Sequence, residues 1–228
     1  MSPSNRLLGL LCVFAAAIPV SAATAQSAQS SAWVAKVQTK AIIVTPLAAN
    51  VPADLSYTVR IGAPDANGDS AVELCALGIG SSQFRFDPTK MLKFLKGSVT
   101  LPAIPAASGE AVAIPTIEIP VGIDAAGKAT DVDEDKKAGV TMVASALGLL
   151  NMDVYVGIKF SLALDAKVQS ADALAGNATF GVSGDIFGSS FPLLGPGKLE
   201  VKQTTVPQPF TAQRIAADQT CAQIVAAR

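Results

Sequence analysis

The chain has 228 residues, with 17 basic and 18 acidic side chains, no histidine, and apolar residues at 50% of its positions. Because no basic surplus exists, a protein that binds nucleic acid through the phosphate backbone is excluded. Without histidine, Ser-His-Asp and Cys-His catalysis are excluded and the commonest ligand of zinc, copper and iron is missing, so we expect no enzyme and no cofactor.

Residues 1–25 have the features of a secretory signal peptide. Arg6 is basic, a short apolar run follows, and Ala23-Thr24-Ala25 supplies the small residues that signal peptidase accepts. The apolar run is too short to span a membrane as a helix. We therefore expect an exported protein, periplasmic or extracellular. Its mature chain has 16 basic residues against 18 acidic ones, because Arg6 leaves with the signal peptide.

The mature chain is predicted to begin with a flexible polar tail over residues 26–32, followed by one β-rich domain over residues 33–228. Cys12 leaves with the signal peptide, so Cys75 and Cys221 are the cysteines that remain. Two cysteines in an exported chain predict one disulfide. Their wide spacing favours a structural bridge over a redox motif, in which the cysteines are usually close in sequence.

The segment NMDVYVGIKFSLALDAKV, residues 151–168, gives the clearest strand signal. Every even position from Met152 to Val168 is apolar, and most odd positions are polar, so the segment predicts a strand with one buried face. Weaker alternation occurs over residues 33–43, 55–61 and 178–186. The centre of the apolar face, which is either core or a ligand surface, consists of Val154, Val156, Ile158, Phe160, Leu162 and Leu164.

This pattern predicts a mainly β protein, an antiparallel β-sandwich with long amphipathic strands. The alternative is a long curved sheet wrapped around an apolar groove. With one Trp and two Tyr, the chain lacks the aromatic girdles of membrane-spanning sheets, so we expect no transmembrane structure after processing. The apolar stretch over residues 99–123 is broken by four prolines, which predicts edge strands or extended excursions.

One short helix is predicted at about residues 87–97. Asp87 can cap it, Pro88 suits the first helical position, and Gly97 suits its end. Residues 170–176 are predicted to connect two strands. The apolar spacing of Ile215, Ala222 and Val225 predicts a helix near the C-terminus, over residues 211–228.

Two acidic segments have the early spacing of a calcium loop. One contains Asp65, Asn67 and Asp69, and the other contains Asp131, Asp133 and Asp135. Neither has the glycine at position 6 or the acid at position 12 that a full EF-hand loop requires. We therefore favour turns in which these side chains form local hydrogen bonds, with a calcium-only site as the alternative.

Two functions remain. The first is a non-catalytic exported β-sandwich that serves envelope or surface structure or protein interaction, with a second copy or an envelope protein as its partner. The alternative is a periplasmic or secreted carrier of an apolar, lipid-like molecule, bound against the face of the 151–168 strand.

Overall fold

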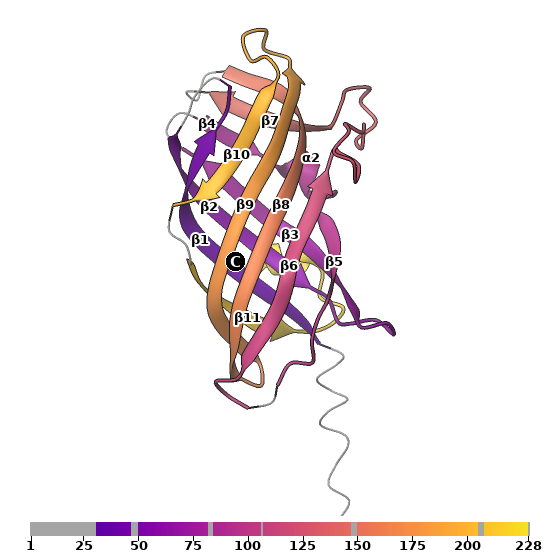
Figure 1. The fold of residues 1–228 in the computed structure, drawn as a ribbon, viewed down its shortest axis with the longest axis vertical. Helices are drawn as coiled ribbons and strands as arrows, with labels where there is room; N and C mark the ends of the chain where they lie inside the picture. Colours follow the sequence, from indigo (N-terminus) through magenta and orange to yellow (C-terminus); the bar gives the residue numbers. More distant parts are fainter. Residues whose placement is uncertain are drawn as a thin grey trace, which may run out of the picture.

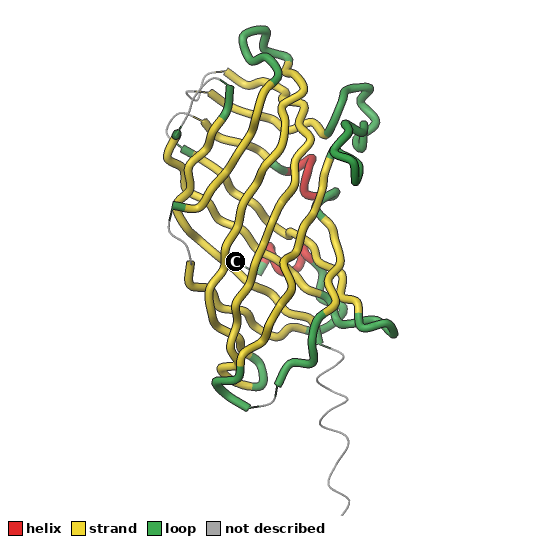
Figure 2. The backbone as a smooth tube through the Cα atoms, in the orientation of Figure 1, coloured by secondary structure: helices red, strands yellow, loops and turns green. Residues whose placement is uncertain are grey.

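The computed structural model describes residues 31–46, 50–81, 84–105, 107–146, 150–204 and 208–227. Eleven strands in these ranges form one antiparallel sheet, and two short helices accompany it (Figures 1 and 2). The predicted mainly β, antiparallel class is confirmed. The predicted signal peptide and residues 26–30 of the predicted tail lie outside the described residues. The strands are β1 Ala32–Val44, β2 Val51–Ile61, β3 Asp69–Gly80, β4 Phe84–Asp87, β5 Lys96–Thr100, β6 Ala111–Val121, β7 Val140–Ala146, β8 Leu150–Ser170, β9 Ala173–Ser189, β10 Gly197–Gln203 and β11 Gln208–Ile215.

The strand pairings return on themselves. The order β9-β11-β1-β2-β3-β4-β7-β8 is hydrogen-bonded throughout, and β8 also pairs with β9. In Figure 1, β6, β8, β9 and β10 form a front wall, and β1, β2 and β3 cross behind it at a steep angle. The two layers of the predicted sandwich are therefore opposite walls of one continuous sheet, and the hydrophobic core lies between them.

The longest strands are β8, with 21 residues, and β9, with 17. The alternation that predicted β8 is reflected in its burial, because Val154, Ile158 and Leu162 are at most 5% exposed. A turn at residues 171–172 joins β8 to β9. The predicted connection over residues 170–176 is therefore wrong, since Ala173–Gly176 already pairs with β8 and β11.

Two glycines allow β9 to curve closely around β8. A Cβ atom at Gly176 would overlap the carbonyl oxygen of Asp165, and one at Gly184 would overlap that of Gly157. Both glycines occupy inward-facing positions of β9, between buried apolar residues. Their missing side chains let the two backbones approach where the sheet bends, the usual role of glycine at a sheet corner.

A β-bulge interrupts β3. Its register with β2 shifts between Thr58 and Val59, so that Cys75 is an extra residue between the pairs Val59–Leu74 and Thr58–Ala76. Buried positions are even before the bulge and odd after it, which explains the mixed pattern of this strand. Because of the bulge, Cys75 lies on the outer face of the sheet, where its disulfide partner Cys221 is located.

The first helix is shorter than predicted. Helix α2 covers Thr89–Leu92, and Lys96–Thr100 forms β5 instead of continuing the helix. The helix ends early because the residues after it pair with β3. The Leu74 amide donates to the Leu95 carbonyl at 3.0 Å, and β5 pairs with Asp69–Glu73. Leu95 is fully buried, and a buried leucine at this position also fits helical spacing, so the apolar pattern alone did not show where the helix ends.

The C-terminal segment is part strand and part helix. Helix α3, Cys221–Ala226, confirms the predicted helix and begins with a capping box between Thr220 and Gln223. The prediction is wrong for Thr211–Ile215, which belongs to β11 between β1 and β9. At the other end of the chain, Ala32 is fully buried in β1, so the sheet begins one residue before the predicted boundary.

Strand β6 is an edge strand, one of the two alternatives that the prolines predicted. It pairs with β8, and among the described residues no strand pairs with its other edge. Pro115 lies within a register shift between Ile114 and Ile117, and Pro120 stands opposite Lys159. Strand β5 lies alongside, where a Cβ at Gly97 would come within 3.1 Å of Ile119, but no ladder joins β5 to β6.

Candidate functional site

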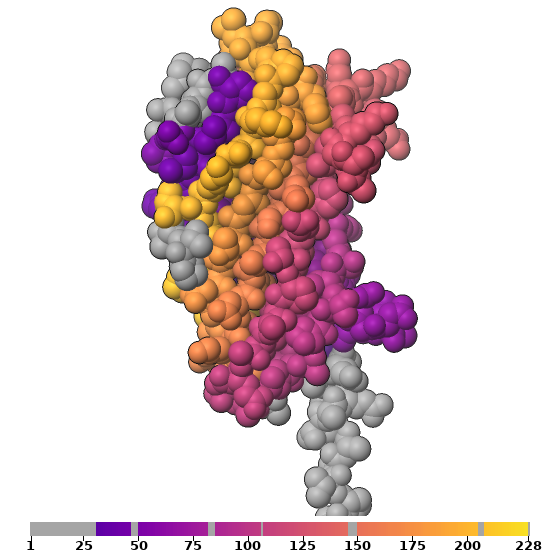
Figure 3. Space-filling model, viewed as in Figure 1, coloured from indigo at the N-terminus to yellow at the C-terminus, as the bar shows by residue number. Residues whose placement is uncertain are grey.

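The apolar face of β8 lies inside the sheet. Three voids along this interior measure about 20, 20 and 10 Å³, and their linings are almost wholly apolar. A void of that size holds one water molecule at most. From outside, the wall of β6, β8 and β9 is a continuous surface (Figure 3). The six predicted face residues, Val154, Val156, Ile158, Phe160, Leu162 and Leu164, are all at most 5% exposed and belong to the core.

One polar pair lies within this apolar interior. Tyr57 is 2% exposed and its ring stacks on Phe180 with centroids 4.6 Å apart. Gln203 is nearby, and its Oε1 accepts a hydrogen bond from the Phe180 amide at 2.9 Å. Burial raises the pKa of the Tyr57 hydroxyl, and the neighbouring Gln203 amide only partly offsets the rise. The phenol is therefore neutral at physiological pH. The sequence contains one indication of this pair, because Gln203 is a polar residue at an inward position of β10.

The disulfide predicted between Cys75 and Cys221 is present. It joins β3 to α3 across 146 positions of sequence, with Cα atoms 4.8 Å apart. Arg60 strengthens this attachment, because its Nε donates to the Gln219 carbonyl and its Nη2 to the Ala217 carbonyl, both at 2.7 Å. The two cysteines thus fix the C-terminal segment to the outer face of the sheet, and the bridge is compatible with an exported protein.

The first acidic segment forms a turn between β2 and β3. Asp65 Oδ1 accepts hydrogen bonds from the amides of Asn67 at 2.8 Å and Asp69 at 3.0 Å. The Asp69 carboxylate accepts another from the Thr100 hydroxyl on β5. These bonds agree with the favoured interpretation, in which Asp and Asn side chains stabilise the turn.

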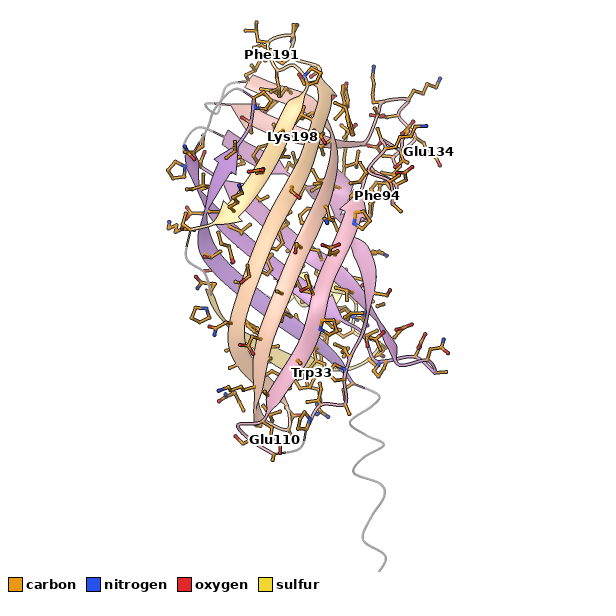
Figure 4. All side chains as sticks on the ribbon, in the orientation of Figure 1. Trp33, Phe94, Glu110, Glu134, Phe191 and Lys198 are labelled. Atoms are coloured by element: carbon orange, nitrogen blue, oxygen red, sulfur yellow. A yellow bond between two sulfur atoms is a disulfide. The ribbon has the colours of Figure 1, made fainter. Side chains whose placement is uncertain are left out.

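The second acidic segment brings its carboxylates together. Asp131, Asp133 and Asp135 place one oxygen each within 4.8 Å of the others. They lie on the loop between β6 and β7, which projects from the sheet and carries Glu134 at its outer side (Figure 4). Glu134 and Lys136 have φ angles of 60° and 66°, a left-handed conformation that non-glycine residues seldom adopt.

Most oxygens of this cluster already accept hydrogen bonds. Asp131 accepts from two loop amides, Asp133 Oδ2 from the Thr141 amide at 2.9 Å, and Asp135 from the Lys137 amide and the Thr141 hydroxyl. The Thr141 hydroxyl lowers the pKa of Asp135. Asp133 Oδ1 is the one cluster oxygen that is buried and unpartnered. Carboxylate oxygens suit calcium, but five of the six already accept hydrogen bonds from loop amides or from Thr141 of β7, so calcium binding stays a prediction.

A surface hollow lies elsewhere, on the outer face of the opposite wall. It has a volume of about 640 Å³ and is open to solvent. Its residues come from β1, from β2, from the end of β3 and the residue that follows it, from β4, and from the residue after β10. Sequence reasoning missed it because these positions are distant in sequence and form no motif. The lining consists of Lys40, Ala41, Pro52, Ala53, Asp54, Gly80, Ser81, Arg85 and Thr204.

In the part of the chain that the structure describes, no helix has the length and apolar character needed to cross a membrane. Comparison with known proteins produced no match: no protein-family model, no curated protein sequence and no solved structure matches the chain. Functional inference therefore depends on the geometry and chemistry of the described residues.

Proposed function

We propose that this chain is a non-catalytic exported β protein that serves envelope or surface structure or protein interaction, and that it acts through its outer surface. The observation that carries the proposal is the filled interior. The inward side chains of both walls form one hydrophobic cluster, and the voids between them hold at most one water molecule each.

The chemistry of the described residues supports a non-catalytic role. The buried phenol of Tyr57 has a raised pKa and therefore stays neutral. The one cluster of carboxylates among the described residues is hydrogen-bonded to its own loop and to Thr141 of β7. The Thr141 hydroxyl lowers the pKa of Asp135, opposite to what a general acid near neutral pH needs. The chain has no histidine that could replace these groups.

The interior favours this function over the lipid carrier. Sites for small molecules usually enclose about 300–1,000 Å³, whereas the interior voids measure about 20 Å³ or less. A lipid-like ligand would have to displace core side chains such as Phe160 and Phe180, whose rings lie 5.8 Å apart. Loss of such contacts costs several kcal/mol, about 3–5 for one Phe side chain.

The strand edges favour contact through sheet faces. Strand β6 carries Pro115 and Pro120, which have no N–H to offer an added strand, and β5 has five residues and begins with Lys96. Short edges, prolines and lysines protect a sheet from edge-to-edge association. A partner, whether a second copy or an envelope protein, would therefore meet side chains on the outer face.

Native mass spectrometry of the mature protein, purified from its own envelope fraction without detergent, tests this function. We expect the mass of the bare chain, alone or as an oligomer, with one disulfide. A bound mass of several hundred daltons that organic solvent releases would contradict the proposal and support the carrier. A Phe160→Ala variant provides a matched control, because an interior ligand would change its occupancy while a bare chain would only lose stability.

A further inference from the structure

We propose that the outer hollow across β1–β4 binds an acidic saccharide, with Arg85 holding a carboxylate and Asp54 accepting hydroxyl hydrogen bonds. This proposal deepens the function above by assigning a ligand class to one outer face. The hollow has a volume of about 640 Å³, and it combines charged groups of both signs with small polar side chains.

The charged residues form one transverse row. Lys40 on β1 pairs with Asp54 on β2, Asp54 pairs with Gly80 on β3, and Gly80 pairs with Arg85 on β4. Directly paired residues of antiparallel strands point to the same face of the sheet. The four consecutive strands β1–β4 therefore present these residues along one line, on the outer face.

The charge of the row favours an anion. Lys40 Nζ forms an ion pair with Asp54 Oδ1, and both side chains are more than 70% exposed. Arg85 is exposed. None of the ion pairs found among the described residues includes it. The hollow thus has a net charge of +1 with an available guanidinium, the group that best matches a carboxylate in a two-pronged hydrogen bond.

Gly80 gives the hollow its floor. A Cβ atom at Gly80 would meet no atom within 4 Å, so the space above this residue is open. Neighbouring strands lie about 4.8 Å apart, which places Asp54 and Arg85 about 10 Å apart with the glycine between them. A polar ring over Gly80 could reach the carboxylate of Asp54 on one side and the guanidinium of Arg85 on the other.

The row continues beyond the hollow in a way that suits a chain of hydroxyls. Arg85 pairs with Ser145 on β7, and Ser145 pairs with Asn151 on β8. At the opposite end, Thr204 adjoins Lys40, to whose carbonyl its amide donates at 3.0 Å. Hydroxyl and amide groups both donate and accept hydrogen bonds, as a polyhydroxylated ligand requires. A peptide is less suited, because the backbone groups of these central strands are already paired.

Calorimetric titration of the full mature chain with oligogalacturonate, an acidic saccharide, tests the site. We expect saturable binding that Arg85→Gln and Gly80→Val each weaken at least tenfold, the first by removing the guanidinium and the second by filling the floor. Gly181→Val is the matched control for Gly80→Val, because a Cβ at Gly181 would meet only the Val201 carbonyl oxygen, at 3.9 Å, and Gly181 lies on β9, in the opposite wall. It should leave the affinity unchanged, and circular dichroism checks that all variants fold.

Several results would overturn the proposal. The first is failure of the wild-type chain to bind oligogalacturonate, and the second is binding by Gly80→Val with the affinity of the wild type. A neutral galactose oligomer that binds as tightly as oligogalacturonate would also contradict the proposal. Inorganic phosphate that competes as well as the saccharide would assign a simple anion site instead. Failure here with a bare mass in native spectrometry removes only the saccharide site. A released lipid mass would instead overturn the proposed function and leave the titration unaffected.

Discussion

Cys75 and Cys221 lie 146 positions apart in the sequence, yet their Cα atoms are 4.8 Å apart across a disulfide on the outer face of β3. The bulge in β3 makes this bridge accessible to the C-terminal helix, because it adds Cys75 as an extra residue between paired positions. The covalent link and the bulge therefore act together to hold the last described segment of the chain against the sheet.

Replacing both cysteines by serine should destabilise the protein. In the chain-entropy description, a bridge that closes a loop of this length stabilises by about 5 kcal/mol, with any native strain subtracting from it. Urea unfolding of the double variant and the oxidised wild type measures the difference. An unchanged free energy of unfolding would show that the bridge does not constrain the unfolded chain.

Arg60→Lys should loosen α3 while leaving the sheet folded. Lysine keeps the charge near Glu73 but cannot make both carbonyl contacts that Arg60 makes with Ala217 and Gln219. We expect a loss of about 1–3 kcal/mol and faster amide exchange within Cys221–Ala226. Arg85→Lys is the control, since Arg85 has no such contacts. Equal exchange in both variants would refute the role of Arg60.

Alanine substitutions at two glycines of β9, Gly184 and Gly181, should have different effects on the stability of the protein. Gly184→Ala would force a Cβ against the Gly157 carbonyl and should cost about 2–3 kcal/mol. Gly181→Ala, three residues earlier, meets only the Val201 carbonyl at 3.9 Å and should be neutral or stabilise by up to about 1 kcal/mol. Thermal unfolding of the pair is the measurement, and similar losses would contradict the close approach of β8 and β9.

The burial of Tyr57 predicts that the folded protein loses stability at alkaline pH. Because burial raises its pKa in the folded state, its stabilising contribution is fully present below the unfolded pKa of about 10 and is lost as pH rises above that value. In a Tyr155→Phe variant Tyr57 is the one tyrosine left, so phenolate absorbance should appear together with unfolding. Absorbance that rises while circular dichroism still reports a folded sheet would contradict the burial of Tyr57.

Strand β8 was predictable because one physical rule, alternate burial, operates over its whole length. Strand β3 was less clear, because the bulge at Cys75 changes the inward phase from even to odd positions. Strand β11 carried a usable signal, since Phe210 and Ala212 are buried while Thr211 and Gln213 are exposed, but the apolar spacing farther along suggested a helix. The helix at 87–97 was predicted too long because an apolar residue at Leu95 fits helical spacing, while its hydrogen bond to β3 leaves no mark on the sequence.

The candidate sites were less predictable than the strands. The disulfide followed from compartment and cysteine count, and the spacing of Asp131, Asp133 and Asp135 identified carboxylates that do converge. The row from Lys40 to Arg85 was not predictable, because it depends on the registers of three strand pairs and on the small size of Gly80. Such registers are set by long-range pairing, which a single sequence does not reveal.

The central claim is that the inner face of β8 is a packed core and not a binding surface. The free energy of unfolding of Leu162→Ala, measured in urea, tests it most directly, with Ser161→Ala on the opposite face of the strand as the control. Because Leu162 is 5% exposed, the packed core predicts a loss of about 2–5 kcal/mol at Leu162 and almost none at Ser161. A loss below about 1 kcal/mol at Leu162 would contradict the claim, because it would mean that the interior is loosely filled.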